Sequence, residues 1–204
     1  NPSAYYDRTA LATLSQDYQG ATPVTATGQT IGLGLDQSQG LALGPEIMTN
    51  YNFDSGGSGW SDTGSAWSFS GGKAIGTAVV NGESLYQNGI ITAGEWYRVV
   101  VDVESADGDI SLSLGGVYMV ENCVVGVNEY TYLATSSGNA NLIGTASTGN
   151  AVVNSFSVKL LAGNHASQPD AGKRPLTAGD PIYVNFDGVD DELVTTFPAS
   201  LGSG

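Results

Sequence analysis

Basic residues are scarce in this chain of 204 residues, which has six Lys and Arg against 20 Asp and Glu. Its formal net charge is −14 at pH 7. Nucleic-acid backbones and anionic lipid surfaces are bound through clustered Lys and Arg, so this balance argues against both as partners. The acidity is instead typical of a well-solvated extracellular or virion surface.

Cysteine and long apolar runs are also rare. Cys123 is the one cysteine, which excludes an internal disulfide and a zinc cluster, and its apolar surroundings in 119–125 predict a buried structural thiol. No stretch approaches 18 consecutive apolar residues, so no membrane insertion is predicted. No secretion signal is visible, and both a particle protein made inside a cell and a trimmed secreted protein fit this sequence.

Glycine is abundant at 29 residues, and 41% of the chain is hydrophobic. This composition is typical of short strands and tight turns around a packed core. Apolar residues alternate between turn pairs such as Asn81-Gly82, and this pattern predicts about ten strands in a two-sheet β-sandwich. The predicted strands are 46–54, 66–70, 73–80, 84–91, 96–104, 109–114, 117–125, 129–135, 140–146 and 151–161.

Four motifs in this region carry a family resemblance. They are Asn50-Tyr-Asn-Phe-Asp-Ser-Gly-Gly-Ser-Gly-Trp60, Trp67-Ser-Phe-Ser-Gly-Gly72, Ile91-Thr-Ala-Gly-Glu-Trp-Tyr-Arg-Val99 and Val153-Asn-Ser-Phe-Ser-Val158. They resemble the landmarks of family 4/9 carbohydrate-binding modules and of related modules in bacteriophage tail-fibre and spike proteins. The resemblance implies a jelly roll of the glycan-binding type.

The flanking sequence resembles a different part of phage fibre proteins. Residues 5–40, ending in Leu35-Asp-Gln-Ser38, are similar to a recurrent fibre segment, whereas Gly163–Gln168 and Tyr183–Asp191 resemble the entry to a laminin-G-like domain. In those proteins the two parts are adjacent. We therefore predict an all-β chain in which a jelly roll at 41–162 is inserted into a partial laminin-G-like host domain at 1–40 and 163–204, because modules with neighbouring termini are readily inserted.

The host part is too short for a complete laminin-G-like sandwich. Two explanations stay open: the chain is a piece of a longer protein, or the host elements pack on a neighbouring subunit. The first is favoured.

Alternation along two strands predicts an outward face with Trp96, Arg98, Tyr86 and Asp102. A flat aromatic ring stacks on the apolar face of a sugar, and charged groups hydrogen-bond its hydroxyls, so these residues are the candidate carbohydrate site. The alternative is that they only cover the sheet or face a neighbouring domain or subunit.

The family resemblance also implies a structural calcium ion, with Asp54 and Asn154 at the ligand positions. Asn154 replaces the usual Asp, which weakens a site for a hard cation. No other cofactor is expected. The acidic pairs Asp102 with Glu104 and Asp107 with Asp109 lack the apolar pocket that a glycosidase acid requires, so no enzyme is predicted. The lone His165 lacks a nucleophile context and is expected to have a structural or interface role.

These observations favour a structural protein of a phage or phage-like particle, a fibre, spike or decoration protein, whose jelly roll attaches to host-surface glycans. The expected location is the virion or the extracellular space. Expected partners are other virion subunits, including copies of the same chain, and a glycan. The alternatives are a purely structural virion protein without sugar binding and the carbohydrate-binding module of a secreted bacterial enzyme.

Overall fold

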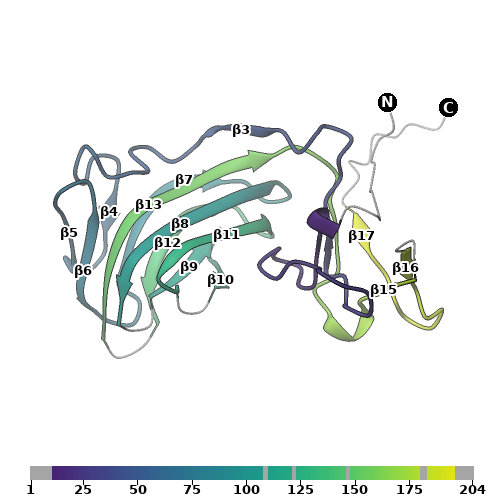
Figure 1. The fold of residues 1–204 in the computed structure, drawn as a ribbon. Coiled ribbons are helices and arrows are strands. Elements are labelled where there is room, and N and C mark those ends of the chain that lie inside the picture. Colours follow the sequence, from purple (N-terminus) through teal and green to yellow (C-terminus); the bar gives the residue numbers. More distant parts are fainter. Residues whose placement is uncertain (1–10, 108–109, 121–122, 146–147, 180–182, 196–204) are drawn as a thin grey trace. The chain divides into compact units, whose positions relative to one another are not determined.

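The structure is a computed structural model that describes residues 11–107, 110–120, 123–145, 148–179 and 183–195 (Figure 1). The chain forms two compact units. Gly44–Leu160 is called the sandwich unit, and Asn1–Leu43 with Leu161–Gly204 is called the flanking unit. The sandwich unit is thus continuous in sequence, whereas the flanking unit is built from two separated segments. Its laminin-G-like assignment stays a prediction.

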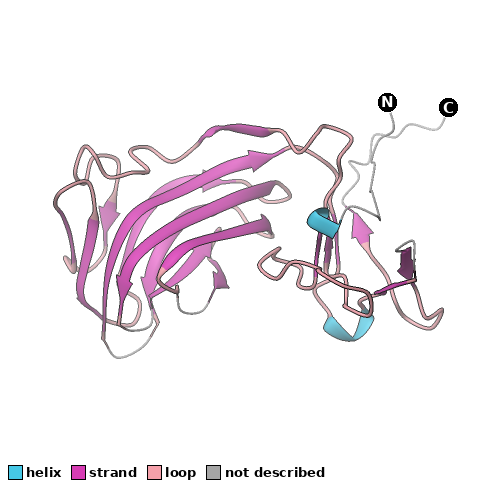
Figure 2. Ribbon diagram, viewed as in Figure 1, coloured by secondary structure: helices cyan, strands magenta, loops and turns pink. Residues whose placement is uncertain are grey.

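The sandwich unit consists of antiparallel strands in two sheets (Figures 1 and 2). The five-stranded sheet has the order β10-β9-β12-β7-β4. Its strands are β4 (Ser61–Asp62), β7 (Ser84–Ile91), β9 (Ile110–Leu114), β10 (Val117–Val120) and β12 (Gly138–Gly144). The six-stranded sheet has the order β11-β8-β13-β6-β5, and β3 also pairs with β13. Its strands are β3 (Leu43–Glu46), β5 (Trp67–Phe69), β6 (Ala74–Val79), β8 (Trp96–Ala106), β11 (Gly126–Leu133) and β13 (Gly149–Leu161).

Alternating apolar residues of both sheets meet in one core. Val99 and Val101 of β8 are fully buried, as are Leu112 of β9 and Leu142 of β12. Such alternation places one face of each strand against the opposite sheet and leaves the other face outward. The predicted all-β fold with a jelly-roll β-sandwich is confirmed. Cys123 also joins this core, and burial raises the pKa of its thiol to about 12.

The predicted strand over 46–54 is wrong. β3 ends at Glu46, and the chain then turns repeatedly, with positive φ angles at Asn50 (52°) and Phe53 (58°). The Asn50 side chain organises this turn, because its Nδ2 donates to the Gly56 carbonyl at 2.7 Å and its Oδ1 accepts from the Ser55 N–H at 3.0 Å. Asn tolerates this left-handed conformation and bonds nearby backbone, which explains a turn where alternation predicts a strand.

The same turn is anchored by aromatic packing. Phe53 is buried, and its ring centroid lies 5.1 Å from that of Trp60 and 6.0 Å from that of Phe69. The Trp60 indole donates from Nε1 to the Asn50 carbonyl at 3.1 Å. The first family-like motif is therefore a compact aromatic turn at the edge of the core.

The flanking unit has shorter elements. A four-stranded sheet has the order β1-β2-β14-β17, and β15 pairs with β16. The elements are η1 (Leu11–Thr13), β1 (Leu14–Ser15), β2 (Leu33–Gly34), β14 (Ala166–Ser167), η2 (Ala171–Lys173), β15 (Leu176–Ala178), β16 (Tyr183–Asn185) and β17 (Val194–Thr195). Leu14, Val24 and Ile31 form its small core. None of the helices in the described ranges has the length and apolar character needed to cross a membrane.

The two segments of the flanking unit are joined at a buried polar junction. Asp36 and His165 are fully buried, and the Asp36 N–H donates to His165 Nδ1 at 2.9 Å. Asp36 Oδ2 accepts from the Asn164 N–H at 2.8 Å, while strands β2 and β14 pair beside it. The segments Leu35–Ser38 and Gly163–Gln168, which the sandwich unit separates in sequence, are therefore in direct contact. His165 has the structural role expected of it.

Candidate functional site

The sequence places Trp96, Arg98 and Asp102 together on β8, but the structure does not leave Trp96 open to a ligand. Its side chain is buried, with 3% exposure. The prediction of Trp96 as an exposed stacking platform is wrong. Alternation gives the face on which a residue lies but not what covers that part of the face.

The charged members of that face are occupied by protein partners. Arg98 forms an ion pair with Glu129, and its Nη1 donates to Thr131 Oγ1 at 2.9 Å. Asp102 Oδ2 accepts from Asn154 Nδ2 at 3.2 Å. Arg98 and Asp102 are half-buried and pair across strands of the six-stranded sheet. Their contacts explain their presence without a ligand.

Tyr86 lies on the other sheet. It belongs to β7 of the five-stranded sheet, whereas Trp96, Arg98 and Asp102 belong to β8 of the six-stranded sheet. Tyr86 points outward as predicted, because its neighbour Leu85 is fully buried in the core. The expected group of four is therefore wrong as a single site: Tyr86 and the three β8 residues face away from the core on opposite sheets.

Strand register places Tyr86 in a different row of side chains. Residues paired across neighbouring strands point to the same face of a sheet. Tyr118 pairs with Ser113, Ser113 with Asn141, Asn141 with Tyr86, and Tyr86 with Ser61. This outward line across all five strands is called the tyrosine row. Tyr118, Ser113 and Asn141 were not predicted from the sequence as members of a binding site.

The tyrosine row is an uneven surface with rings near its ends. Tyr118 is 46% exposed and Tyr86 is half-buried. Between them, Ser113 is buried and accepts a hydrogen bond from Asn141 Nδ2 at 3.3 Å. Neighbouring strands are about 4.8 Å apart, so the three strand spacings from β10 to β7 separate the tyrosine-bearing strands by about 14 Å.

The face around the row is uncharged. Asp62 is the one charged residue in the five strands of this sheet. Its carboxylate accepts from the N–H groups of Gly64 at 3.0 Å and Trp67 at 3.1 Å, so it is occupied within the chain. The six-stranded sheet, in contrast, carries Glu46, Arg98, Asp102, Glu104, Glu129 and Lys159. In a chain of net charge −14, an uncharged face suits a neutral ligand.

The residues at the implied calcium positions have separate partners. Asp54 is exposed and accepts a hydrogen bond from the Asn52 amide. Asn154 donates to Asp102 instead. Calcium requires six to eight oxygen ligands, and the described contacts do not bring Asp54 and Asn154 together into such a cage. The calcium site stays a prediction.

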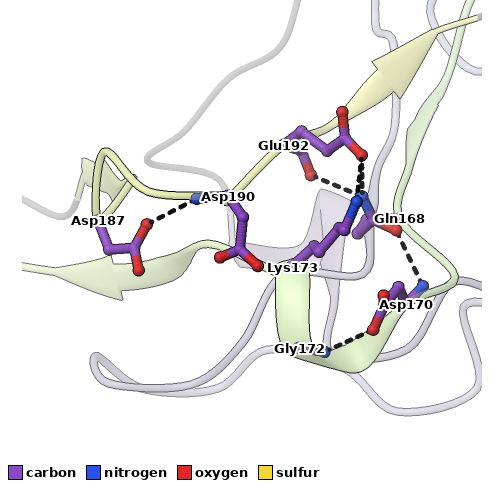
Figure 3. A network of polar contacts seen from close by, with 7 residues as sticks. All are labelled: Gln168, Asp170, Gly172, Lys173, Asp187, Asp190 and Glu192. Atoms are coloured by element: carbon purple, nitrogen blue, oxygen red, sulfur yellow. Dashed lines mark hydrogen bonds and ion pairs between the residues drawn. The ribbon is translucent and has the colours of Figure 1, made fainter.

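A cluster of three carboxylates occurs in the flanking unit, and Figure 3 shows two of them, Asp187 and Asp190. Single oxygens of Asp187, Asp190 and Asp191 lie within 4.8 Å of one another. Backbone N–H groups, first that of Val189 at 2.8 Å, lower the pKa of Asp187, and Asp191 Oδ2 accepts from the Asp187 N–H. Nearby, Glu192 contacts Lys173 and Gln168. The acidic residues thus form an exposed turn stabilised by its own amides.

The carboxylate pairs considered for catalysis also have protein partners. Asp102 accepts from Asn154, and Glu104 forms an ion pair with Lys73. Asp107 accepts from the Asn150 side chain and backbone, and these hydrogen bonds lower its pKa. Its predicted companion Asp109 lies outside the described residues. A lowered pKa is the opposite of what a general acid requires.

No protein-family model matches the chain, and no curated protein matches it. A solved structure described as "CBM4 structure and function" is similar to it, with 16% sequence identity and a TM-score of 0.41. The similarity covers 53% of the chain and 99% of that structure. A similarity with so low a TM-score says nothing about a ligand of this chain.

Proposed function

We propose that the sandwich unit binds a neutral glycan across the five-stranded sheet. The observation that carries the proposal is the tyrosine row, with Tyr118 and Tyr86 flanking Ser113 and Asn141 on an uncharged face. Tyrosine rings stack on the apolar C–H faces of pyranose rings, and amide and hydroxyl groups hydrogen-bond sugar hydroxyls. The spacing of about 14 Å between β10 and β7 suits a chain of several sugars lying across the strands.

At a finer level, we propose that the chain is part of a phage or phage-like particle and attaches it to glycans on the host surface. The fibre-like sequences at 5–40 and 163–191 support this assignment, as does the contact between their Asp36 and His165. Single glycan modules of this kind bind weakly. Many copies on one particle, with other virion subunits as partners, raise the avidity without stronger individual contacts.

Two other functions make different predictions. A carbohydrate-binding module of a secreted bacterial enzyme uses the same tyrosine row but accompanies a catalytic domain elsewhere in its protein. A purely structural virion protein has no glycan affinity. The tyrosine row favours the two glycan-binding functions over the structural one.

Isothermal titration calorimetry with a panel of neutral oligosaccharides tests the proposal. We expect Tyr86→Ala and Tyr118→Ala each to weaken binding about fivefold to tenfold, because each removes a stacking contact of about 1 kcal/mol. Arg98→Ala is the control, since Arg98 lies on the opposite sheet, and should leave the affinity unchanged. Absence of binding to every glycan, or loss of binding in Arg98→Ala alone, would refute the proposed site.

A further inference from the structure

A small hollow adjoins the tyrosine row at one end of the five-stranded sheet. It has a volume of about 210 Å³ and lies where the β9–β10 turn meets the beginning of β12. Its lining residues are Gly115, Gly116, Ser137, Gly138, Asn139 and Asn141. All are uncharged, and Asn141 also belongs to the tyrosine row. The hollow is therefore continuous with the proposed glycan site.

The hollow depends on close backbone approach. Gly115 has a φ angle of 60°, and a Cβ at this position would lie 2.0 Å from the Ser136 carbonyl oxygen. A Cβ on Gly138 would lie 3.2 Å from Gly115 Cα. The Gly115 N–H donates to the Asn139 carbonyl at 2.8 Å, which fixes the turn against β12. Glycine at these positions lets the β9–β10 turn lie directly against the beginning of β12, where the hollow is found.

The polar groups around the hollow leave a donor for a ligand. Ser137 Oγ accepts from the Ala93 N–H at 2.9 Å, and Asn139 Oδ1 accepts from the Gly89 N–H at 3.1 Å. The second contact fixes the orientation of the Asn139 amide. No described residue accepts from its Nδ2 group, so the amide hydrogens can bond a ligand oxygen.

The geometry points to a subsite for a side branch, and we propose that the hollow receives a single neutral sugar or similar substituent that branches from the bound glycan. A glycan along the tyrosine row crosses the strands, so its substituents point along the strand direction, which is where the hollow lies beyond Asn141. Its volume is below the about 300 Å³ at which ligand pockets begin, and it suits a substituent better than a whole ligand. This inference rests on the proposed glycan function.

The test compares matched neutral glycans by titration calorimetry. The probes are linear β-1,4-glucan oligosaccharides and their xylosyl-branched forms, with linear and galactosyl-branched β-1,4-mannan oligosaccharides as a second pair. For the backbone that the full chain binds, we expect the branched form to bind about fivefold more tightly, the contribution of about one hydrogen bond. Asn139→Asp should abolish this preference, because it keeps the acceptor for Gly89 but removes the Nδ2 donor.

The outcomes separate the two proposals. Equal or weaker binding of branched forms, or an unchanged preference in Asn139→Asp, overturns the side-branch subsite while the glycan function stands. Affinity for the linear backbone should be the same in Asn139→Asp as in the native chain, which shows that the sheet is intact. Absence of binding to every linear and branched probe overturns the side-branch subsite, and absence of binding to the whole panel of neutral oligosaccharides overturns the glycan function as well.

Discussion

Tyr86 and Trp96 are both aromatic residues that alternation places on the outer face of a strand, yet only Tyr86 is partly exposed. Trp96 is buried, and its neighbours Arg98 and Asp102 are bonded to Glu129 and Asn154. Tyr86 is half-buried beside the uncharged Asn141. Residue type alone therefore predicts a binding residue poorly, because coverage and polar partners decide whether a side chain can contact a ligand.

His165 gives a prediction at the scale of one residue. Burial lowers its pKa from 6.5 to about 4, despite the opposing charge of Asp36, and its Nδ1 accepts from the Asp36 N–H. It is the one histidine of the chain, so its ring resonances can be followed by NMR without ambiguity. We expect a titration midpoint near pH 4. A midpoint near 6.5 would contradict the buried, neutral assignment.

The same shift makes the stability of the flanking unit depend on pH. The unfolded chain takes up the proton near pH 6.5 and the folded chain only near pH 4, so stability is complete above 6.5 and falls as the pH decreases toward 4. The total loss is about 3 kcal/mol. His165→Gln keeps an acceptor for the Asp36 N–H but does not titrate, and it should remove the pH dependence between 6.5 and 5 measured by urea denaturation.

At the scale of elements, the junction between β2 and β14 predicts the effect of Asp36→Ala. Asp36 accepts from the Ser38 N–H at 2.8 Å, the Ser38 hydroxyl at 2.9 Å and the Asn164 N–H at 2.8 Å. Removing the carboxylate leaves three half-buried donors without their acceptor, which should destabilise the flanking unit by about 3 kcal/mol. Hydrogen exchange of the Asn164 amide should accelerate accordingly.

Asp17→Ala is the matched control for this prediction. Asp17 likewise accepts three hydrogen bonds, but all come from backbone N–H groups of its own loop, at Gln19, Ala21 and Thr22. The substitution should loosen that loop and leave the Asn164 amide protected. Equal acceleration of Asn164 exchange in both variants would show that Asp36 does not specifically join the two segments.

The strands themselves were largely predictable, whereas their order was not. Alternation correctly indicated strands such as β7, β8 and β9, because side chains on a strand alternate between core and solvent. The tyrosine row depends on β9 and β7 both pairing with β12, and these are long-range pairings that no local pattern encodes. The binding face could therefore not be assembled from the sequence.

At the scale of the whole molecule, charge distribution predicts how binding responds to salt. The chain carries a net charge of −14, but the five strands around the tyrosine row have one charged residue, Asp62. Affinity for a neutral glycan should change less than about twofold between 50 mM and 500 mM NaCl, since no ion pairs are made. Calorimetry at both salt concentrations checks this.

The same charge distribution predicts weaker binding of acidic glycans than of neutral ones. The net negative charge repels a polyanion at low salt, so a uronic-acid polymer should bind more weakly than a neutral polymer, and the difference should shrink as salt is added. Preferential binding of the acidic polymer would contradict the neutral-ligand assignment.

NMR chemical-shift mapping with a bound neutral oligosaccharide is a direct test of glycan binding across the five-stranded sheet. Backbone amides of β7, β9, β10 and β12 should shift on titration, most strongly near Tyr118, Asn141 and Tyr86, while those near Arg98 on β8 stay unchanged. Shifts concentrated on β8, β11 and β13 would contradict binding across the five-stranded sheet. The absence of any shift in this sheet with an oligosaccharide that binds the chain would also contradict it.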